Sequence, residues 1–147
     1  MGLFDAIDIS GSALSTERLR MDVTAENLAN AQTTRGANGQ PYRRKVVEVQ
    51  QQPEETSFGS ALSGAMGSAV GPSGVRVSAI GQDTTPNRMV YDPGHPDANA
   101  QGYVSMPNVD PVSEMVDLIT ESRGYEANVT AMQAAKTMFT KTLDLLR

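Results

Sequence analysis

The fold is decided by residues 111–147, which read PVSEMVDLITESRGYEANVTAMQAAKTMFTKTLDLLR. Proline occurs only at the first position, where it suits the first turn of a helix, and Asp110 before it is a good N-cap. Bulky side chains then recur every seven residues, at Leu118, Tyr125, Met132, Phe139 and Leu146. A strict seven-residue repeat is typical of helices that pack along a seam. The sequence therefore predicts a long terminal helix that needs a partner helix.

A second stripe with the same period lies near the start of the chain. Residues 3–30 are predicted to form a helix whose stripe consists of Ile7, Leu14, Met21 and Leu28. Because glycine weakens a helix interior by about 1 kcal/mol relative to alanine, Gly11 predicts that the first ten residues form a separate or frayed turn. The simplest interpretation of both stripes is that the two helices pair with each other within one molecule. We expect part of each stripe to close that pair and the rest to contact neighbouring molecules.

The middle of the chain has a different character. Residues 41–52 are predicted to form a strand, and shorter strands are expected around 75–79, 89–91 and 103, separated by glycine- and proline-containing turns. Residues 57–74 consist mostly of Ser, Gly and Ala, which predicts a flexible loop. The expected fold class is α+β, with long terminal helices and a small antiparallel β-unit of three or four strands between them in the sequence.

Composition narrows the function classes. The chain of 147 residues is 39% hydrophobic and 5% aromatic, which leaves little material for a large closed core, so we expect apolar surface to be buried against partners. A net charge of -5 argues against nucleic acid. The absence of cysteine excludes disulfides and thiolate chemistry. The first residues do not have the pattern of a cleaved secretory signal, and we expect no stable membrane insertion.

Candidate chemistry is sparse. His95 is the single histidine and lies in a turn, and neither a phosphate-binding loop nor a calcium loop is present. We therefore expect no catalytic residue, no cofactor and no metal site. The acids Glu114 and Asp117 suit the N-terminal end of a helix dipole. The basic run Arg43-Arg44-Lys45 is interpreted as a solvated patch or an ion-pair site, with an inter-subunit contact as the functional alternative.

Several motifs carry a resemblance to a known family. Asn27-Leu28-Ala29-Asn30 followed by Thr33 resembles the N-terminal signature of the rod and hook axial proteins of the bacterial flagellum. The similarity continues through Tyr42-Arg43-Arg44-Lys45, through residues 90–97 and 102–104, and through residues 107–109, 114–116 and 122–129. It covers nearly the whole chain except the Ser/Gly/Ala tract. Gly11 and Gly124 depart from the helical pattern that the family favours.

The resemblance implies a structural role and no enzymatic activity. It implies that residues 1–35 and 111–147 pack antiparallel as a coiled-coil-like inner domain, and that residues 36–110 form a small outer segment. It also implies a subunit of the proximal rod of the basal body, which polymerises with other rod proteins and with copies of itself into the drive shaft. Export by the flagellar type III apparatus, without a cleaved signal, would bring it to the periplasmic space.

Two alternatives remain open on the sequence alone. The chain could be another rod or hook axial component. A protein of a different class, a hydrolase that cuts the cell wall, would need paired carboxylates or a metal site.

Overall fold

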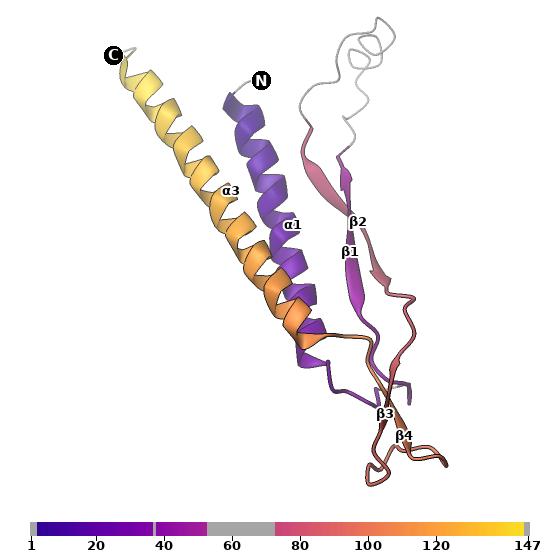
Figure 1. The fold of residues 1–147 in the computed structure, drawn as a ribbon. Helices are drawn as coiled ribbons and strands as arrows, with labels where there is room; N and C mark the ends of the chain where they lie inside the picture. The colour runs from indigo at the N-terminus through magenta and orange to yellow at the C-terminus, as the bar shows by residue number, and fades with distance from the viewer. Residues whose placement is uncertain (1–2, 37, 53–72, 146–147) are drawn as a thin grey trace, which may run out of the picture. The chain divides into compact units, whose positions relative to one another are not determined.

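The structure is a computed structural model that describes residues 3–36, 38–52 and 73–145. Along the chain the elements are α1 (Leu3–Ala29), β1 (Lys45–Gln51), β2 (Val75–Gln82), β3 (Arg88–Tyr91), β4 (Tyr103–Met106) and α3 (Pro111–Leu145) (Figure 1). This order confirms the predicted α+β class. Leu146 and most of the predicted loop at 57–74 lie outside the described residues.

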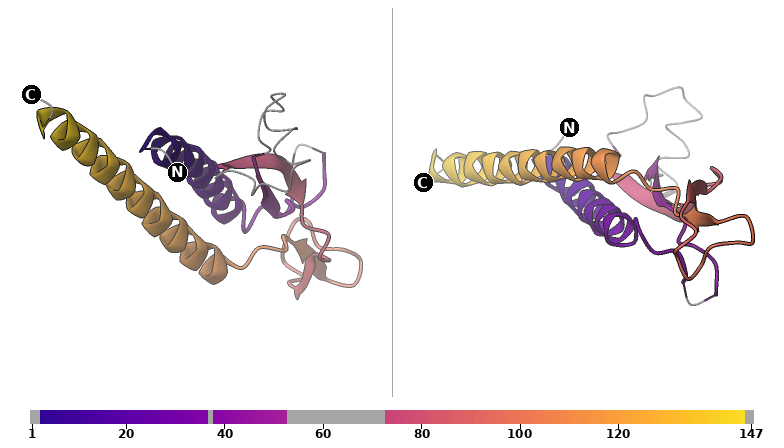
Figure 2. Two further views of the ribbon diagram at one scale, coloured as in Figure 1. Left: turned by 90° about the horizontal axis from the view of Figure 1, so that it is seen from above. Right: turned by 60° about the horizontal axis from the view of Figure 1, so that its bottom comes forward.

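Both long helices are continuous (Figure 2). The prediction that the first ten residues form a separate turn is wrong, because α1 runs unbroken from Leu3 through Gly11. A Cβ placed on Gly11 would lie 3.8 Å from Cε of Met132, so this part of α1 packs against α3. Packing of this kind supplies most helical stability in proteins and outweighs the propensity of one glycine.

The predicted cap of α3 is confirmed in detail. Oδ1 of Asp110 accepts a hydrogen bond from the backbone N–H of Val112 at 3.2 Å, and Oδ2 accepts one from the Ser113 hydroxyl at 2.9 Å. These bonds, the one from the Ser113 hydroxyl first, lower the pKa of Asp110. The carboxylate therefore satisfies N–H groups that the first turn of the helix leaves without a partner.

Contacts divide the chain into two compact units, and each helix contributes to both. The first unit comprises Met1–Arg18, Val49–Ser78 and Arg123–Arg147, and the second comprises Leu19–Glu48 and Ala79–Ser122. In the first unit Gly124 lies against Glu17, as Gly11 lies against Met132. In the second unit Thr24 contacts Glu121 and Asn27 contacts Glu114. Within each unit residue numbers rise along one helix while they fall along the other, so the predicted antiparallel pairing is confirmed.

The strands form two separate two-stranded sheets instead of one larger unit. In the first sheet the N–H of Gln52 bonds to the carbonyl of Gly74 and the N–H of Asp83 bonds to that of Arg44, an antiparallel pattern. In the second sheet β3 and β4 are antiparallel with Tyr91 opposite Tyr103. An Asx turn at Asp83 ends the first ladder before β3 begins, which is why the strands do not join.

The interior is small and unusually polar. Among the described residues the buried apolar side chains include Val23, Ala31, Val104, Val109 and Ala135, and the buried polar ones are Thr16, Thr24, Asn27 and Glu114. Polar groups are buried at little cost only when they are hydrogen-bonded or paired. The buried polar residues are therefore the first place to look for specific function. Within the described part of the chain, neither long helix is apolar enough over a sufficient length to cross a bilayer.

Candidate functional site: a buried polar network on the helix pair

Asn27 is the centre of a polar network in the second unit. Its side chain is 1% exposed. Nδ2 donates to the carbonyl oxygen of Lys45 at 2.9 Å and to Oε2 of Glu114 at 3.2 Å. Oδ1 accepts from the N–H of Lys45 and from the Tyr42 hydroxyl, both at 2.9 Å. Two donors and two acceptor positions are the full capacity of an asparagine side chain, so every hydrogen-bonding position of Asn27 is used.

The asparagine side chain takes the place of a neighbouring strand. Its amide group exchanges hydrogen bonds with both the N–H and the C=O of Lys45, as opposed residues do in a hydrogen-bonded antiparallel strand pair. Lys45 is the first residue of β1, and Asn27 lies near the end of α1. The bonded pair therefore fixes the start of the strand on the helix.

Glu114 brings α3 into the same network. Its side chain is 1% exposed, and Oε1 lies 2.5 Å from Nε of Arg44. Nη2 of Arg44 also lies 3.3 Å from Oδ2 of Asp117, which is on the next turn of α3. The bond to Glu114 is the first cause of the raised pKa of Arg44. A buried carboxylate is tolerated because a guanidinium and an amide compensate its charge.

Further bonds tie the surrounding chain to this centre. The backbone N–H of Arg44 donates to Oδ1 of Asn108 at 2.9 Å, and Nζ of Lys45 lies 2.5 Å from Oε1 of Glu26. Burial raises the pKa of Tyr42 to about 12, and the charges of Glu26 and Glu114 add to the shift. In the basic run Arg43-Arg44-Lys45, both Arg44 and Lys45 therefore form ion pairs. An ion-pair site was one of the interpretations of this run from the sequence.

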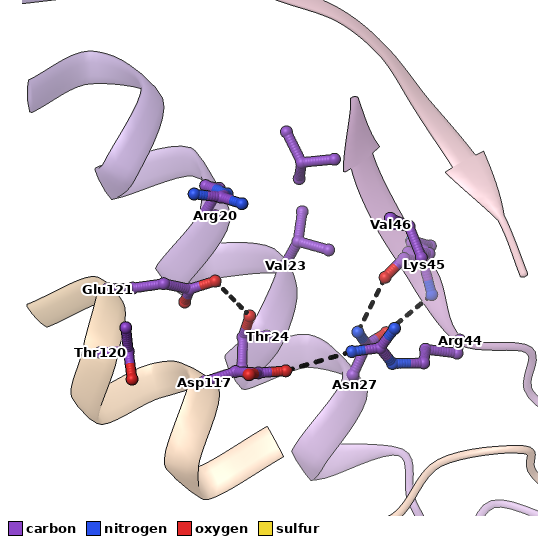
Figure 3. A pocket seen from close by; sticks show the side chains of 11 residues that line it. Arg20, Val23, Thr24, Asn27, Arg44, Lys45, Val46, Asp117, Thr120 and Glu121 are labelled. Atoms are coloured by element: carbon purple, nitrogen blue, oxygen red, sulfur yellow. Dashed lines mark hydrogen bonds and ion pairs between the residues drawn. The ribbon is translucent and has the colours of Figure 1, made fainter. Parts of the chain in front are cut away.

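A cleft of about 200 Å³ lies beside the network (Figure 3). Its walls come from α1, β1 and the first turns of α3, within the second unit. The lining residues are Arg20, Val23, Thr24, Asn27, Arg44, Lys45, Val46, Val47, Asp117, Thr120 and Glu121. Cations and carboxylates of the network are paired with each other, as the dashed contacts between Arg44 and Asp117 in Figure 3 illustrate. Ion pairs of this kind hold α1, β1 and α3 together within the second unit.

The residues predicted for the helix seam are less buried than this network. Half-buried positions are Ile7, Leu14, Met21, Leu28, Leu118, Tyr125 and Met132, whereas Phe139 is 37% exposed. Leu146 lies outside the described residues. The half-exposed state leaves apolar surface available, and the assignment of these residues to assembly stays a prediction.

The sequence interpretation missed a second stripe on α3. Glu114, Glu121, Asn128 and Ala135 also recur every seven residues, and all four are buried or half-buried. The neighbouring residue Met115, by contrast, is 45% exposed. Oε1 of Glu121 accepts a hydrogen bond from the Thr24 hydroxyl at 3.1 Å. The seven-residue period of this stripe is visible in the sequence, but three of its four residues are polar, so it does not form an apolar repeat.

The remaining motif residues have distinct surroundings. Nδ2 of Asn30 donates to the carbonyl of Glu26 at 2.9 Å, and the Thr33 hydroxyl donates to Oδ1 of Asn30 at 3.2 Å, so the two residues finish α1. The N–H of Tyr42 donates to the carbonyl of Thr33, which closes the loop before β1. Leu28 is half-buried, and Ala29 and Arg43 are exposed. A functional role for these residues stays a prediction.

Family profiles match both helical ends of the chain. Residues 7–37 match the family described as flagella basal body rod protein. Residues 100–145 match the family described as flagellar basal body rod FlgEFG protein C-terminal.

Whole-length relatives carry one description. The chain is 51% identical to the flagellar basal-body rod protein FlgC of Bacillus subtilis strain 168, with 99% of each protein covered. It is 44% identical to FlgC of Escherichia coli O6:H1, over 99% of this chain and 98% of the relative. It is 40% identical to FlgC of Borreliella burgdorferi, over 100% of this chain and 99% of the relative.

Proposed function

The chain belongs to the FlgC family of flagellar basal-body rod proteins, and we propose that it is a structural subunit of the proximal rod, which transmits motor torque to the hook and filament. The observation that carries this proposal is the 51% identity to a FlgC protein across 99% of both chains. The function is mechanical and involves no enzymatic step.

The helix pair is suited to bear load. Helices of 27 and 35 residues run without a break, and close-packed protein interiors deform little. The network of Asn27, Arg44 and Glu114 ties both helices to β1 inside the second unit. Such cross-ties resist sliding of one element along another.

Exposed apolar side chains support assembly with partners. On the first turns of α3, Val112, Val116 and Ile119 are 64%, 57% and 55% exposed. Met138, near the other end of the helix, is 58% exposed. Burying apolar surface is worth about 25 cal/mol per Å², so a subunit gains stability when a neighbour covers these faces. The partners in this proposal are other rod proteins and further copies of the chain.

The location follows from the same role. In the proposed arrangement residues 1–35 and 111–147 form the inner layer of the rod, residues 36–110 form the outer one, and the rod crosses the periplasmic space. The subunit reaches it through the flagellar type III export apparatus with its N-terminus uncleaved. Intact-mass measurement on the protein from isolated basal bodies tests this point, since removal of an N-terminal segment would contradict it.

A charge placed in the seam tests the assembly role. In cells that lack the gene, the chain should restore rods and motility, whereas Leu14→Asp should restore neither, because it puts a carboxylate into a half-buried apolar site. Ser15→Asp is the matched control, since Ser15 is the next residue of the same helix and is exposed. Immunoblots of cell extracts establish that both variants are made at equal levels. Motile cells with the Leu14 variant would refute the seam assignment.

The cell-wall hydrolase alternative is tested separately. Purified protein should release no soluble fragments from peptidoglycan. Turnover above that of a heat-treated sample would overturn the structural assignment.

A further inference from the structure

The apolar stripes specify that the helices pair, but they do not specify how. A stripe that repeats every seven residues matches itself again after a shift of one heptad, about 10 Å along the helix. Leu118, Tyr125 and Met132 are bulky side chains at successive repeats, so each can replace the one before it. Register therefore needs a feature that does not repeat.

Arg44 supplies that feature in the second unit. It is the only residue of the described network that bonds two carboxylates of α3, Glu114 at 2.5 Å and Asp117 at 3.3 Å. Its backbone N–H is held by Asn108, just before the helix. Arg44 therefore contacts two residues of α3 that are three positions apart, and it also bonds Asn108 in the segment before the helix.

One of the two possible shifts breaks the buried pair. If α3 moved by one heptad so that Glu121 took the place of Glu114, Arg44 would keep a carboxylate partner and lose only the contact with Asp117, whose place Gly124 would take. In the other direction Pro107 would replace Glu114 and leave Arg44 without its buried partner. Uncompensated buried charge is strongly unfavourable, so this second shift is penalised far more than the apolar stripes alone would penalise it.

We propose that the Arg44–Glu114 ion pair is a specificity device that fixes the register of the α1–α3 pair against the shift that would place Pro107 beside Arg44. Replacing a buried ion pair with apolar side chains of similar size is often neutral or stabilising, so a role in selecting register accounts for a pair at this position.

The test compares register in the parent chain with that in a double variant, Arg44→Met with Glu114→Leu. The chain contains no cysteine, so any cross-link must join the two cysteines that are introduced. Thr24→Cys with Glu121→Cys reports the native register, in which these side chains touch. Gly11→Cys with Tyr125→Cys reports the shift in which Pro107 would replace Glu114, because Gly11 lies against Met132, seven residues further along α3, in the native register. A short bifunctional thiol reagent is applied to purified protein and to isolated basal bodies.

In the parent, the native pair should cross-link within one chain at least tenfold more than the shifted pair. In the double variant, the two yields should become comparable. Arg44→Lys with Glu114 intact should restore most of the discrimination, since the charge pair is kept.

Two results would overturn the proposal: an unchanged ratio in the double variant, or no native cross-link in the parent. The first would mean that the ion pair does not set register. The second would mean that the pairing itself does not exist. Both are measured on the purified chain, so they are distinct from a failure to restore rods in cells.

Discussion

Replacing Asn27 with alanine should be the most damaging single truncation in the helix pair. The change removes four hydrogen bonds, three with neutral groups and one with the buried Glu114 carboxylate. A neutral bond is worth about 1 kcal/mol net and a bond to a charged group about 1.5–3 kcal/mol, which gives an upper value of roughly 6 kcal/mol. Lys45 and Tyr42 are only half-buried, so water can replace part of the loss. We expect a loss of about 3 kcal/mol.

The assay is urea denaturation followed by circular dichroism, with the midpoint and slope fitted separately. An unchanged slope with a lower midpoint means that stability has changed and the denatured state has not. Asn128→Ala is the matched control, because Asn128 is a half-buried asparagine whose Nδ2 donates to the carbonyl of Gly124 on its own helix. Its truncation should change stability by less than about 0.5 kcal/mol. Equal losses for the two variants would refute the role assigned to Asn27.

Three further predictions concern the helices and the loop before β1. Gly11→Ala and Gly124→Ala should each raise stability by up to about 1 kcal/mol, since the added Cβ would make ordinary contacts at 3.8 Å and 3.6 Å; a lower melting temperature would show that the helices pack more tightly than described. Tyr42, whose pKa is raised to about 12, should ionise well above pH 10. Its folded pKa exceeds the unfolded value, so its contribution is present below pH 10 and disappears as the pH rises toward 12; phenolate absorbance of the Tyr42→Phe variant identifies the missing step. Asp110, whose pKa is lowered, contributes above its unfolded pKa, and this contribution is lost as the pH falls through the folded value. Asp110→Ala should therefore weaken the protein at neutral pH and much less in acid, as thermal melts at both pH values would show.

The helices could be predicted because their signals are local. Asp110 and Pro111 mark the start of α3, and the seven-residue period runs through both helices. The break expected after Gly11 was wrong because propensity describes an isolated helix, whereas α1 is packed against α3 in the first unit. A sequence pattern records the intrinsic cost of a glycine and does not record the contacts that outweigh it.

The polar network could not be derived from the sequence. Glu114 has the type and position of an acid that favours the start of a helix through the dipole, which was the interpretation given to it. Its burial depends on Arg44, 70 residues away along the chain, and on Asn27. The motif around Asn27 indicated this residue through the family resemblance. Only the structure shows that its side-chain amide bonds the backbone of Lys45, the first residue of β1.

The balance of polar and apolar burial also bears on how such a chain can assemble. A protein that buries its best apolar surface inside itself leaves little free energy to gain from association. Here Val112, Val116 and Ile119 stay exposed, while Asn27 and Glu114 are nearly inaccessible. Hydrogen bonds and ion pairs are directional, so they can fix how the elements of the second unit pair without consuming apolar area. The subunit can then keep its apolar faces for neighbours, while the buried polar network fixes how its own elements pair.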